Sequence, residues 1–147
     1  MGTDGTLASM NDLLEAASAY LTESDVEQTA QKLDEIKNSV VLEETSESFQ
    51  SLYNGLVDAI GTEVAQISYD AGYASYQAQD YEAAAVSLQK AVDYDPDLAD
   101  AWYYLGRAYH LTEEKEKAIA SYEKFIEMLP NTERAGNARR YIEELSE

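Results

Sequence analysis

Cysteine is absent from this 147-residue sequence, and histidine and tryptophan occur once each. The lack of cysteine excludes disulfide bonds, thiolate zinc sites and cysteine nucleophiles. It leaves the localisation unknown, because a cysteine-free chain suits either side of a membrane. Proline occurs twice and glycine seven times, and so few helix-breaking residues favour long helices joined by short connections.

Basic residues are also scarce, since 10 lysines and arginines stand against 29 acids and give a net charge of −19. A chain this acidic repels a phosphate backbone, so we expect no nucleic-acid binding. Its field favours protein partners with basic flanks. Seven of the ten bases fall in residues 99–147, which makes the last third the least acidic part.

Long hydrophobic runs are missing too. No apolar stretch approaches the roughly 18 residues that span a bilayer, and no signal-peptide pattern is present, so we expect no direct membrane insertion. The start "MGTDGTLAS" looks like a short tag or disordered tail over 1–8, or like the cut end of an excised domain. Whether a signal or anchor was removed upstream stays open.

Apolar residues recur at helical spacing along most of the chain. They predict helices over about 9–22 and 26–40, and a third stripe that begins at Phe49 and continues in phase to Ile67. Gly61-Thr62 interrupts this third stripe with a helix-stop signal followed by a new N-cap. We therefore expect a break or a bend there.

From residue 65 the sequence repeats itself. Residues 65–98 align with 99–132 at an offset of 34 without gaps and share nine identities, among them Gly72/Gly106, Ala84/Ala118 and Pro96/Pro130. A period of 34 carrying helical stripes indicates stacked helical hairpins.

The second copy resembles the tetratricopeptide repeat, whose pattern W-x2-L-G-x2-Y, A-x3-F, P matches Trp102, Leu105, Gly106, Tyr109, Ala118, Tyr122 and Pro130. Only the Phe is changed, to Tyr122. The first copy is weaker and keeps Gly72, Ala84, Leu88, Ala91 and Pro96. These are packing positions: each glycine should face the small alanine of its own hairpin, and each proline should end a second helix. Asp80 and Thr112 should cap the inner turns.

The resemblance implies an all-α fold, a right-handed superhelical stack of antiparallel helical hairpins with about seven helices. We divide the chain into a tail (1–8), an N-terminal helical segment (9–62), a first repeat (63–98), a second repeat (99–132) and a C-terminal capping helix (133–147). The N-terminal segment has hairpin spacing without the motif, so a degenerate repeat there stays open.

A second set of aromatic residues lies off the packing positions. Tyr69, Tyr73 and Tyr76 share one helix face, and steps of 34 lead to Tyr103, Arg107 and His110, and then to Asn137, Tyr141 and Glu144. In tetratricopeptide proteins this face lines the concave groove that holds ligand peptides. The resemblance thus implies a peptide-binding groove made of Tyr69, Tyr73, Tyr76, Tyr103, Arg107, His110, Arg134 and Tyr141. The alternative, that the tyrosines pack on the preceding helices, stays equally open.

Other kinds of site find little support. The run "DYDPDLAD" spaces aspartates like a calcium loop but has Leu98 in place of the required glycine, so we expect no metal and no cofactor. No nucleophile elbow, phosphate loop or paired-histidine motif occurs, and we expect no enzyme. Some family members grip the C-terminal carboxylate of heat-shock chaperones, but only Arg134 fits that set.

The sequence therefore predicts a non-catalytic protein–protein interaction module, a scaffold that binds a peptide or partner helix in the groove of its repeats. The alternative is a structural component of cell-envelope assembly that associates with itself or with a membrane anchor. The oligomeric state and the identity of the partner are not predicted.

Overall fold

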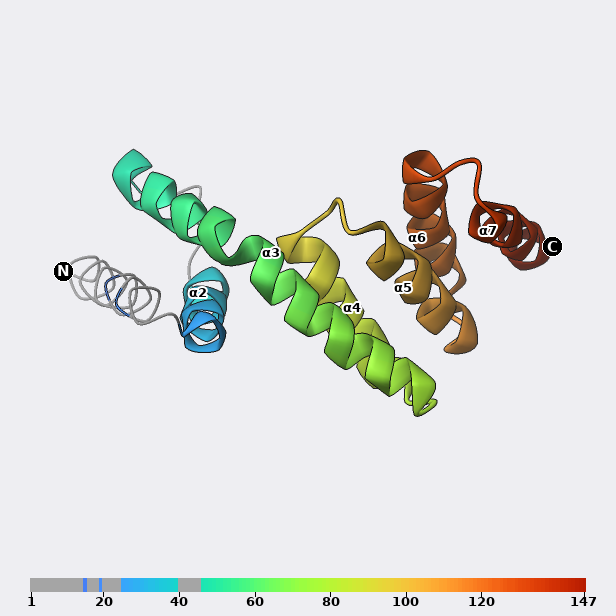
Figure 1. Ribbon diagram of the computed structural model, residues 1–147, viewed down its shortest axis with the longest axis horizontal. Coiled ribbons are helices and arrows are strands. Elements are labelled where there is room, and N and C mark those ends of the chain that lie inside the picture. Colours follow the sequence, from blue (N-terminus) through green and yellow to red (C-terminus); the bar gives the residue numbers. More distant parts are fainter. Residues whose placement is uncertain (1–14, 16–18, 20–24, 40–45) are drawn as a thin grey trace. The chain divides into compact units, whose positions relative to one another are not determined.

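The computed structural model describes residues 25–39 and 46–147, together with residues 15 and 19 (Figure 1). Within these residues every regular element is a helix: α2 (Val26–Ser39), α3 (Glu47–Gln77), α4 (Tyr81–Tyr94), α5 (Ala99–Leu111), α6 (Lys115–Met128) and α7 (Glu133–Ser146). The predicted all-α fold is confirmed, with a number of helices close to the expected seven. The tail over 1–8 and, apart from residues 15 and 19, the helix expected over 9–22 lie outside the described residues.

The chain divides into two compact units, residues 1–64 and 65–147, and α3 crosses the division. In the first unit the apolar stripes recognised in the sequence are buried: Leu33 and Ile36 of α2, and Phe49, Tyr53, Leu56 and Ile60 of α3. Helix α2 begins after Asp25, whose carboxylate accepts a hydrogen bond of 3.0 Å from the backbone N–H of Gln28. Such a bond satisfies one of the unpaired amides at a helix start.

Helix α3 runs without interruption from Glu47 to Gln77, so a break at Gly61-Thr62 is wrong, whereas the bend that we gave as the alternative stays a prediction. A glycine inside a helix costs only about 1 kcal/mol relative to alanine. On either side of it the apolar stripe stays in phase and buries Ile60 and Val64. Burial of two such side chains, at about 1.5–3 kcal/mol each, outweighs the cost of the glycine.

The second unit holds two helical hairpins with the same inner turn. Between α3 and α4, Gln79 donates to the carbonyl of Tyr76 and Asp80 donates to that of Ser75. The turn between α5 and α6 repeats both bonds 34 residues later, through Glu113 and Glu114. Gln79 and Glu113 have φ values of 64° and 63°, so both helices end in a Schellman motif with a residue other than glycine in the left-handed position.

The caps of these turns differ in one respect from those expected. Asp80 caps α4 as predicted, accepting from the backbone N–H of Ala83 at 3.2 Å. Thr112 instead ends α5, and its hydroxyl donates to the carbonyl of Ala108 at 3.1 Å. The left-handed turn at Glu113 separates Thr112 from α6, so its side chain can reach back to α5 only.

Each hairpin is closed at its glycine, but the neighbour is not the expected alanine. A Cβ atom at Gly72 would lie 2.6 Å from Cγ of Leu88, and one at Gly106 would lie 2.7 Å from Cδ1 and Cε1 of Tyr122. The glycine of each repeat therefore makes room for the large residue one helical turn beyond Ala84 or Ala118. Tyr122 itself is fully buried.

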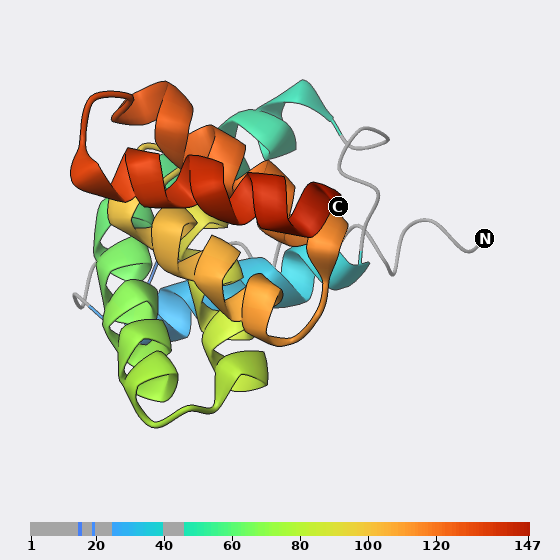
Figure 2. The same cartoon turned by 90° about the vertical axis from the view of Figure 1, so that its right-hand side faces the viewer.

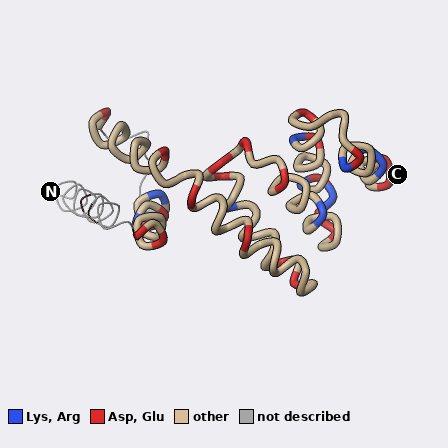
Figure 3. Tube along the Cα trace, in the orientation of Figure 1, with Lys and Arg blue, Asp and Glu red and all other residues tan. Residues whose placement is uncertain are grey.

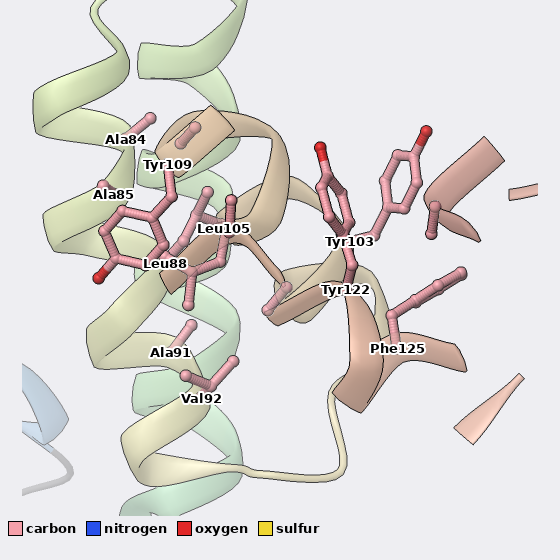
Figure 4. Packing of buried hydrophobic residues seen from close by; sticks show 14 of the residues in the cluster. Ala84, Ala85, Leu88, Ala91, Val92, Tyr103, Leu105, Tyr109, Tyr122 and Phe125 are labelled. Carbon is pink, nitrogen blue, oxygen red and sulfur yellow. The ribbon is translucent and has the colours of Figure 1, made fainter. Parts of the chain in front are cut away.

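The core of the second unit lies between α4, α5, α6 and α7 (Figures 1 and 2). Tyr109 lies against Ala84, Ala85 and Leu88, whereas Tyr103 and Tyr122 lie on the other side of Leu105 (Figure 4). Helix α7 buries Ala135 and Ala138 against α6. Trp102 is partly buried at the edge of this core, and its indole N–H donates to the carbonyl of Pro96 at 2.7 Å, which ties the inter-hairpin loop to α5.

Candidate functional site

Tyrosines of α3 and α5 form an aromatic cluster. The rings of Tyr69 and Tyr73 stack with centroids 6.0 Å apart, while Tyr104 lies 4.9 Å from Tyr73 and 5.3 Å from Tyr76. The two contacts of Tyr104 are edge-to-face, an arrangement that aromatic quadrupoles favour. All four side chains are half-buried. Burial, with nearby Asp100 adding to it, raises the pKa of Tyr69 to about 12, so this hydroxyl is protonated at neutral pH.

Arg107 of α5 connects this cluster to α7. Its Nε–H donates to the hydroxyl of Tyr76 at 3.3 Å, and its guanidinium carbon lies 4.6 Å from the ring centroid of Tyr141. Burial alone would lower the pKa of Arg107, but the hydrogen bond to Tyr76 and the oxygens of Tyr122 and Tyr141 raise it above its ordinary value. The side chain therefore remains a cation held by the hydroxyl of Tyr76 and the ring of Tyr141.

His110 lies one turn further along α5, on the same face. Its Nδ1 is 3.2 Å from the hydroxyl of Tyr122, and its ring meets that of Tyr141 edge-to-face at 5.4 Å. Burial, followed by repulsion from Arg107, lowers the pKa of His110, while Glu144 opposes the shift. The imidazole is therefore neutral at pH 7 and belongs to the aromatic packing rather than to the cationic part of the face.

Arg134, in the first turn of α7, completes the set. Its guanidinium lies 5.5 Å from the ring of Tyr103 and 5.8 Å from that of Tyr104. It also donates to Asp100 at 2.7 Å, so its charge is already neutralised. All eight residues predicted from the sequence thus lie in one connected set, which with Tyr104 we call the tyrosine–arginine face: Tyr69, Tyr73, Tyr76, Tyr103, Tyr104, Arg107, His110, Arg134 and Tyr141.

The register of the contacts differs from the expected one. Steps of 34 residues predicted that Tyr73, Arg107 and Tyr141 line up. Arg107 does meet Tyr141, but the α3 residue that it bonds is Tyr76, 31 residues away. Tyr73–Tyr104, Tyr103–Arg134 and His110–Tyr141 also join positions 31 residues apart. Helical side chains lean toward the N-terminus of their helix. A residue can therefore contact, in the neighbouring repeat, the side chain that lies one helical turn away from its equivalent position.

Tyr104 is the member that the sequence analysis did not select. It touches all three α3 tyrosines and Tyr103, which places it at the centre of the face. A signal was present, because Tyr104 precedes Arg107 by three residues and so shares its helix face. The 34-residue offset does not identify Tyr104, because the equivalent residue of the first repeat is Asp70 rather than a tyrosine.

The charges of the face contrast with those of the chain. All four arginines lie between residues 107 and 140, and three of them, Arg107, Arg134 and Arg140, lie over rings of the face. Figure 3 shows basic residues gathered on α5, α6 and α7, whereas acidic residues are spread along the chain. The arginines of this acidic chain thus gather at the face, where Arg134 is paired with Asp100 and Arg107 lies over the ring of Tyr141.

A cleft of about 430 Å³ lies elsewhere on the second unit, lined by Glu82, Ala85, Val86, Gln89, Tyr109, Thr112, Glu114 and Lys117. Tyr109 donates to Gln89 at 3.1 Å, and Lys117 pairs with Glu114 at 2.5 Å. Val86 is 74% exposed there. The polar groups of this cleft largely pair with one another.

The described residues show no metal site and no membrane-spanning helix. Among them, no group of three histidine, aspartate or glutamate side chains could bind a metal ion. None of their helices combines the length and the apolar character needed to cross a membrane.

Comparison with known proteins bears on the repeat segment. Residues 69–133 match a family model described as tetratricopeptide repeat. This segment is a tetratricopeptide-repeat segment. The match contains every residue of the tyrosine–arginine face except Arg134 and Tyr141, which lie on the helix that follows. The comparison with curated proteins gave no match.

Several solved structures resemble the chain. The first tetratricopeptide domain of Spaghetti (RPAP3), bound to an HSP90 peptide, is 16% identical, with a TM-score of 0.47 and coverage of 94% of this chain and 96% of that one. A crystal structure of MamA is 22% identical (TM-score 0.48, covering 93% and 86%). The C-terminal tetratricopeptide domain of a Plasmodium falciparum FK506-binding protein is 17% identical (TM-score 0.43, covering 96% and 88%).

Proposed function

We propose that this protein is a non-catalytic interaction module that binds a peptide or partner helix on the tyrosine–arginine face of its tetratricopeptide repeats. We assign the repeats to residues 63–98 and 99–132, with residues 133–147 as a capping helix. The observation that carries the proposal is the connected face itself, in which residues of α3, α5 and α7 present half-buried rings and hydroxyls side by side.

The composition of the face supports binding rather than packing alone. Tyrosine and arginine are over-represented among residues that dominate binding energies, because each offers flat apolar area with polar edges. Tyr73, Tyr76 and Arg107 are only half-buried, so part of each stays accessible. The acidic remainder of the chain favours a partner whose flanks are basic.

A library of random short peptides, displayed on phage and selected on the wild-type protein, tests the proposal. Enriched peptides are then titrated by calorimetry against Tyr73→Ala and against Val86→Ala, which alters the cleft at α4 instead. We expect Tyr73→Ala to weaken binding by roughly 1–3 kcal/mol, because the ring contributes contact area. Val86→Ala should leave the affinity unchanged.

Thermal unfolding of both variants separates binding from stability. Binding lost with Val86→Ala and kept with Tyr73→Ala would place the ligand in the cleft and refute the assignment to the face. A large loss of stability in Tyr73→Ala with unaltered affinity would make the tyrosines core residues. If no peptide is enriched and the protein sediments as an oligomer, the structural, self-associating role becomes the better description.

A further inference from the structure

We propose that the ligand of the tyrosine–arginine face presents an internal aspartate or glutamate side chain to Arg107, within a segment whose other residues are apolar or basic. This inference rests on the proposed function and narrows it to one kind of ligand. It arises from a charge that no acidic side chain within residues 25–39 and 46–147 pairs with.

Arg107 is a half-buried cation without an acidic partner among the described residues. The ion pairs found there join Lys32 to Glu35, Lys117 to Glu114, Lys124 to Glu127 and Arg134 to Asp100, and none includes Arg107. The chain has 29 acids for 10 bases, so a carboxylate would be easy to supply. A partly desolvated charge is costly unless paired, and an acid from a ligand would complete the pair.

The surroundings of Arg107 suit a carboxylate. The Nε–H donates to the hydroxyl of Tyr76, and the ring of Tyr141 supports the guanidinium plane. A guanidinium has five N–H donors, so the bond to Tyr76 leaves the terminal N–H groups for a ligand. With its plane fixed, the remaining fork matches the two oxygens of one carboxylate.

The position of Arg107 indicates a side chain rather than a chain terminus. Along α5, Tyr104 lies one turn before Arg107 and His110 one turn after it, and each contacts another aromatic ring of the face. A peptide could therefore continue over aromatic surface in both directions. Arg134, the other arginine of the face, is already paired with Asp100, which leaves Arg107 as a single cation and disfavours a more highly charged group such as phosphate.

The net charge limits how acidic the ligand can be. At −19 the protein repels a segment with several acids, so a single acid among apolar or basic residues fits both the local cation and the wider field. This combination distinguishes the proposed ligand from a generally acidic tail.

The experiment uses an array of peptides that share randomised flanks and differ at a fixed central position: Glu, Gln, Lys or phosphoserine. A further set carries the glutamate at its free C-terminus. Each set is probed with the wild type, with Arg107→Gln, and with Lys124→Gln, which removes an exposed α6 cation outside the face. We expect the wild type and Lys124→Gln to prefer central Glu over Gln by about tenfold. Arg107→Gln should show no preference.

The outcomes separate this inference from the proposed function. Equal binding of the Glu and Gln sets by the wild type overturns the role of Arg107 but leaves peptide binding intact. A preference for phosphoserine or for the C-terminal set overturns the choice of an internal carboxylate. No binding of any set refutes both proposals.

Two further variants keep the test valid if Arg107→Gln does not fold. Arg107→Lys keeps the charge but loses the planar fork, and Tyr76→Phe removes the hydroxyl that holds Nε. Both should reduce the preference for Glu without abolishing binding. An unchanged preference in both variants would contradict the proposed geometry.

Discussion

At the scale of single residues, tyrosine occurs in this protein both as a core residue and as a surface residue. Tyr122 is fully buried and keeps its hydroxyl satisfied by His110, and burial raises its pKa well above the usual value. Tyr73 and Tyr104 are half-buried and present ring faces and edges at the surface. The ring supplies apolar area in both settings, and the hydroxyl needs a partner or water. Tyrosine can therefore belong to the core and to the face of the same repeat.

Glycine gives the clearest prediction at this scale. A side chain at Gly106 would meet the buried ring of Tyr122 at 2.7 Å, whereas nothing lies within 4 Å of a Cβ at Gly136. We therefore expect Gly106→Leu to destabilise the protein by about 1–3 kcal/mol through overpacking. Gly136→Leu, on the exposed side of α7, should stabilise it by roughly 0.5–1 kcal/mol by improving helix propensity.

Urea unfolding followed by circular dichroism measures both changes. Because the two variants introduce the same side chain into a helix, their difference reports the contact with Tyr122. Equal free energies of unfolding for the two variants would be incompatible with the close approach of α5 and α6 described above.

At the scale of elements, the repeat was the most predictable feature. The 34-residue offset revealed the two hairpins because their packing residues, among them Gly72/Gly106 and Ala84/Ala118, recur by identity. It could not place the end of each first helix, since Gln79 and Glu113 adopt left-handed φ values without the glycine that normally signals them. The stop signal at Gly61 left a break and a bend open, and the break does not occur because burial along α3 outweighs the local signal.

The candidate site was predictable as a set but not in its contacts. Seven of its members follow from repeat spacing and Arg134 from the set with which some family members grip a carboxylate, whereas the pairing of all these residues depends on the lean and crossing of side chains between helices. The repeat period of the sequence does not contain this one-turn displacement between contacting side chains. It therefore paired Tyr73 with Arg107, whereas the residue that Arg107 bonds is Tyr76. Tyr104 was missed for a related reason, since its partners lie on another helix.

The two inner turns give the prediction at the element scale. Glu113 and Gln79 hold φ near +60°, which costs an ordinary residue about 1–2 kcal/mol. We expect Glu113→Gly and Gln79→Gly each to raise the free energy of unfolding by about 0.5–1 kcal/mol, since glycine relieves the strain but also adds freedom to the unfolded chain.

Glu116→Gly provides the matched control, because Glu116 lies in the first turn of α6. There glycine should lower stability by up to about 1 kcal/mol. Thermal unfolding of the three variants checks the signs. A loss of stability in all three would mean that the left-handed turns cause no strain to be relieved.

At the scale of the whole molecule, the net charge of −19 is the dominant feature. Long-range repulsion among so many acids destabilises the compact state. The ion pairs that could oppose it, such as Lys117–Glu114 and Lys124–Glu127, are largely exposed. Exposed pairs contribute only about 0–1 kcal/mol each, so we expect the repulsion to be the larger effect.

The balance of these two effects predicts how stability depends on salt. Raising the sodium chloride concentration from a few millimolar to about 0.15 M shortens the Debye length to about 8 Å, which screens distant like charges more than pairs in contact. We therefore expect the melting temperature to rise over this range. Glu123→Gln, which removes one exposed acid from the interior of α6, should raise it at low salt and reduce its salt dependence. Lys124→Gln should lower the melting temperature at low salt and increase its salt dependence.

A melting temperature that falls as salt is added would show instead that the ion pairs in contact outweigh the repulsion, and that the acidic charges are compensated locally.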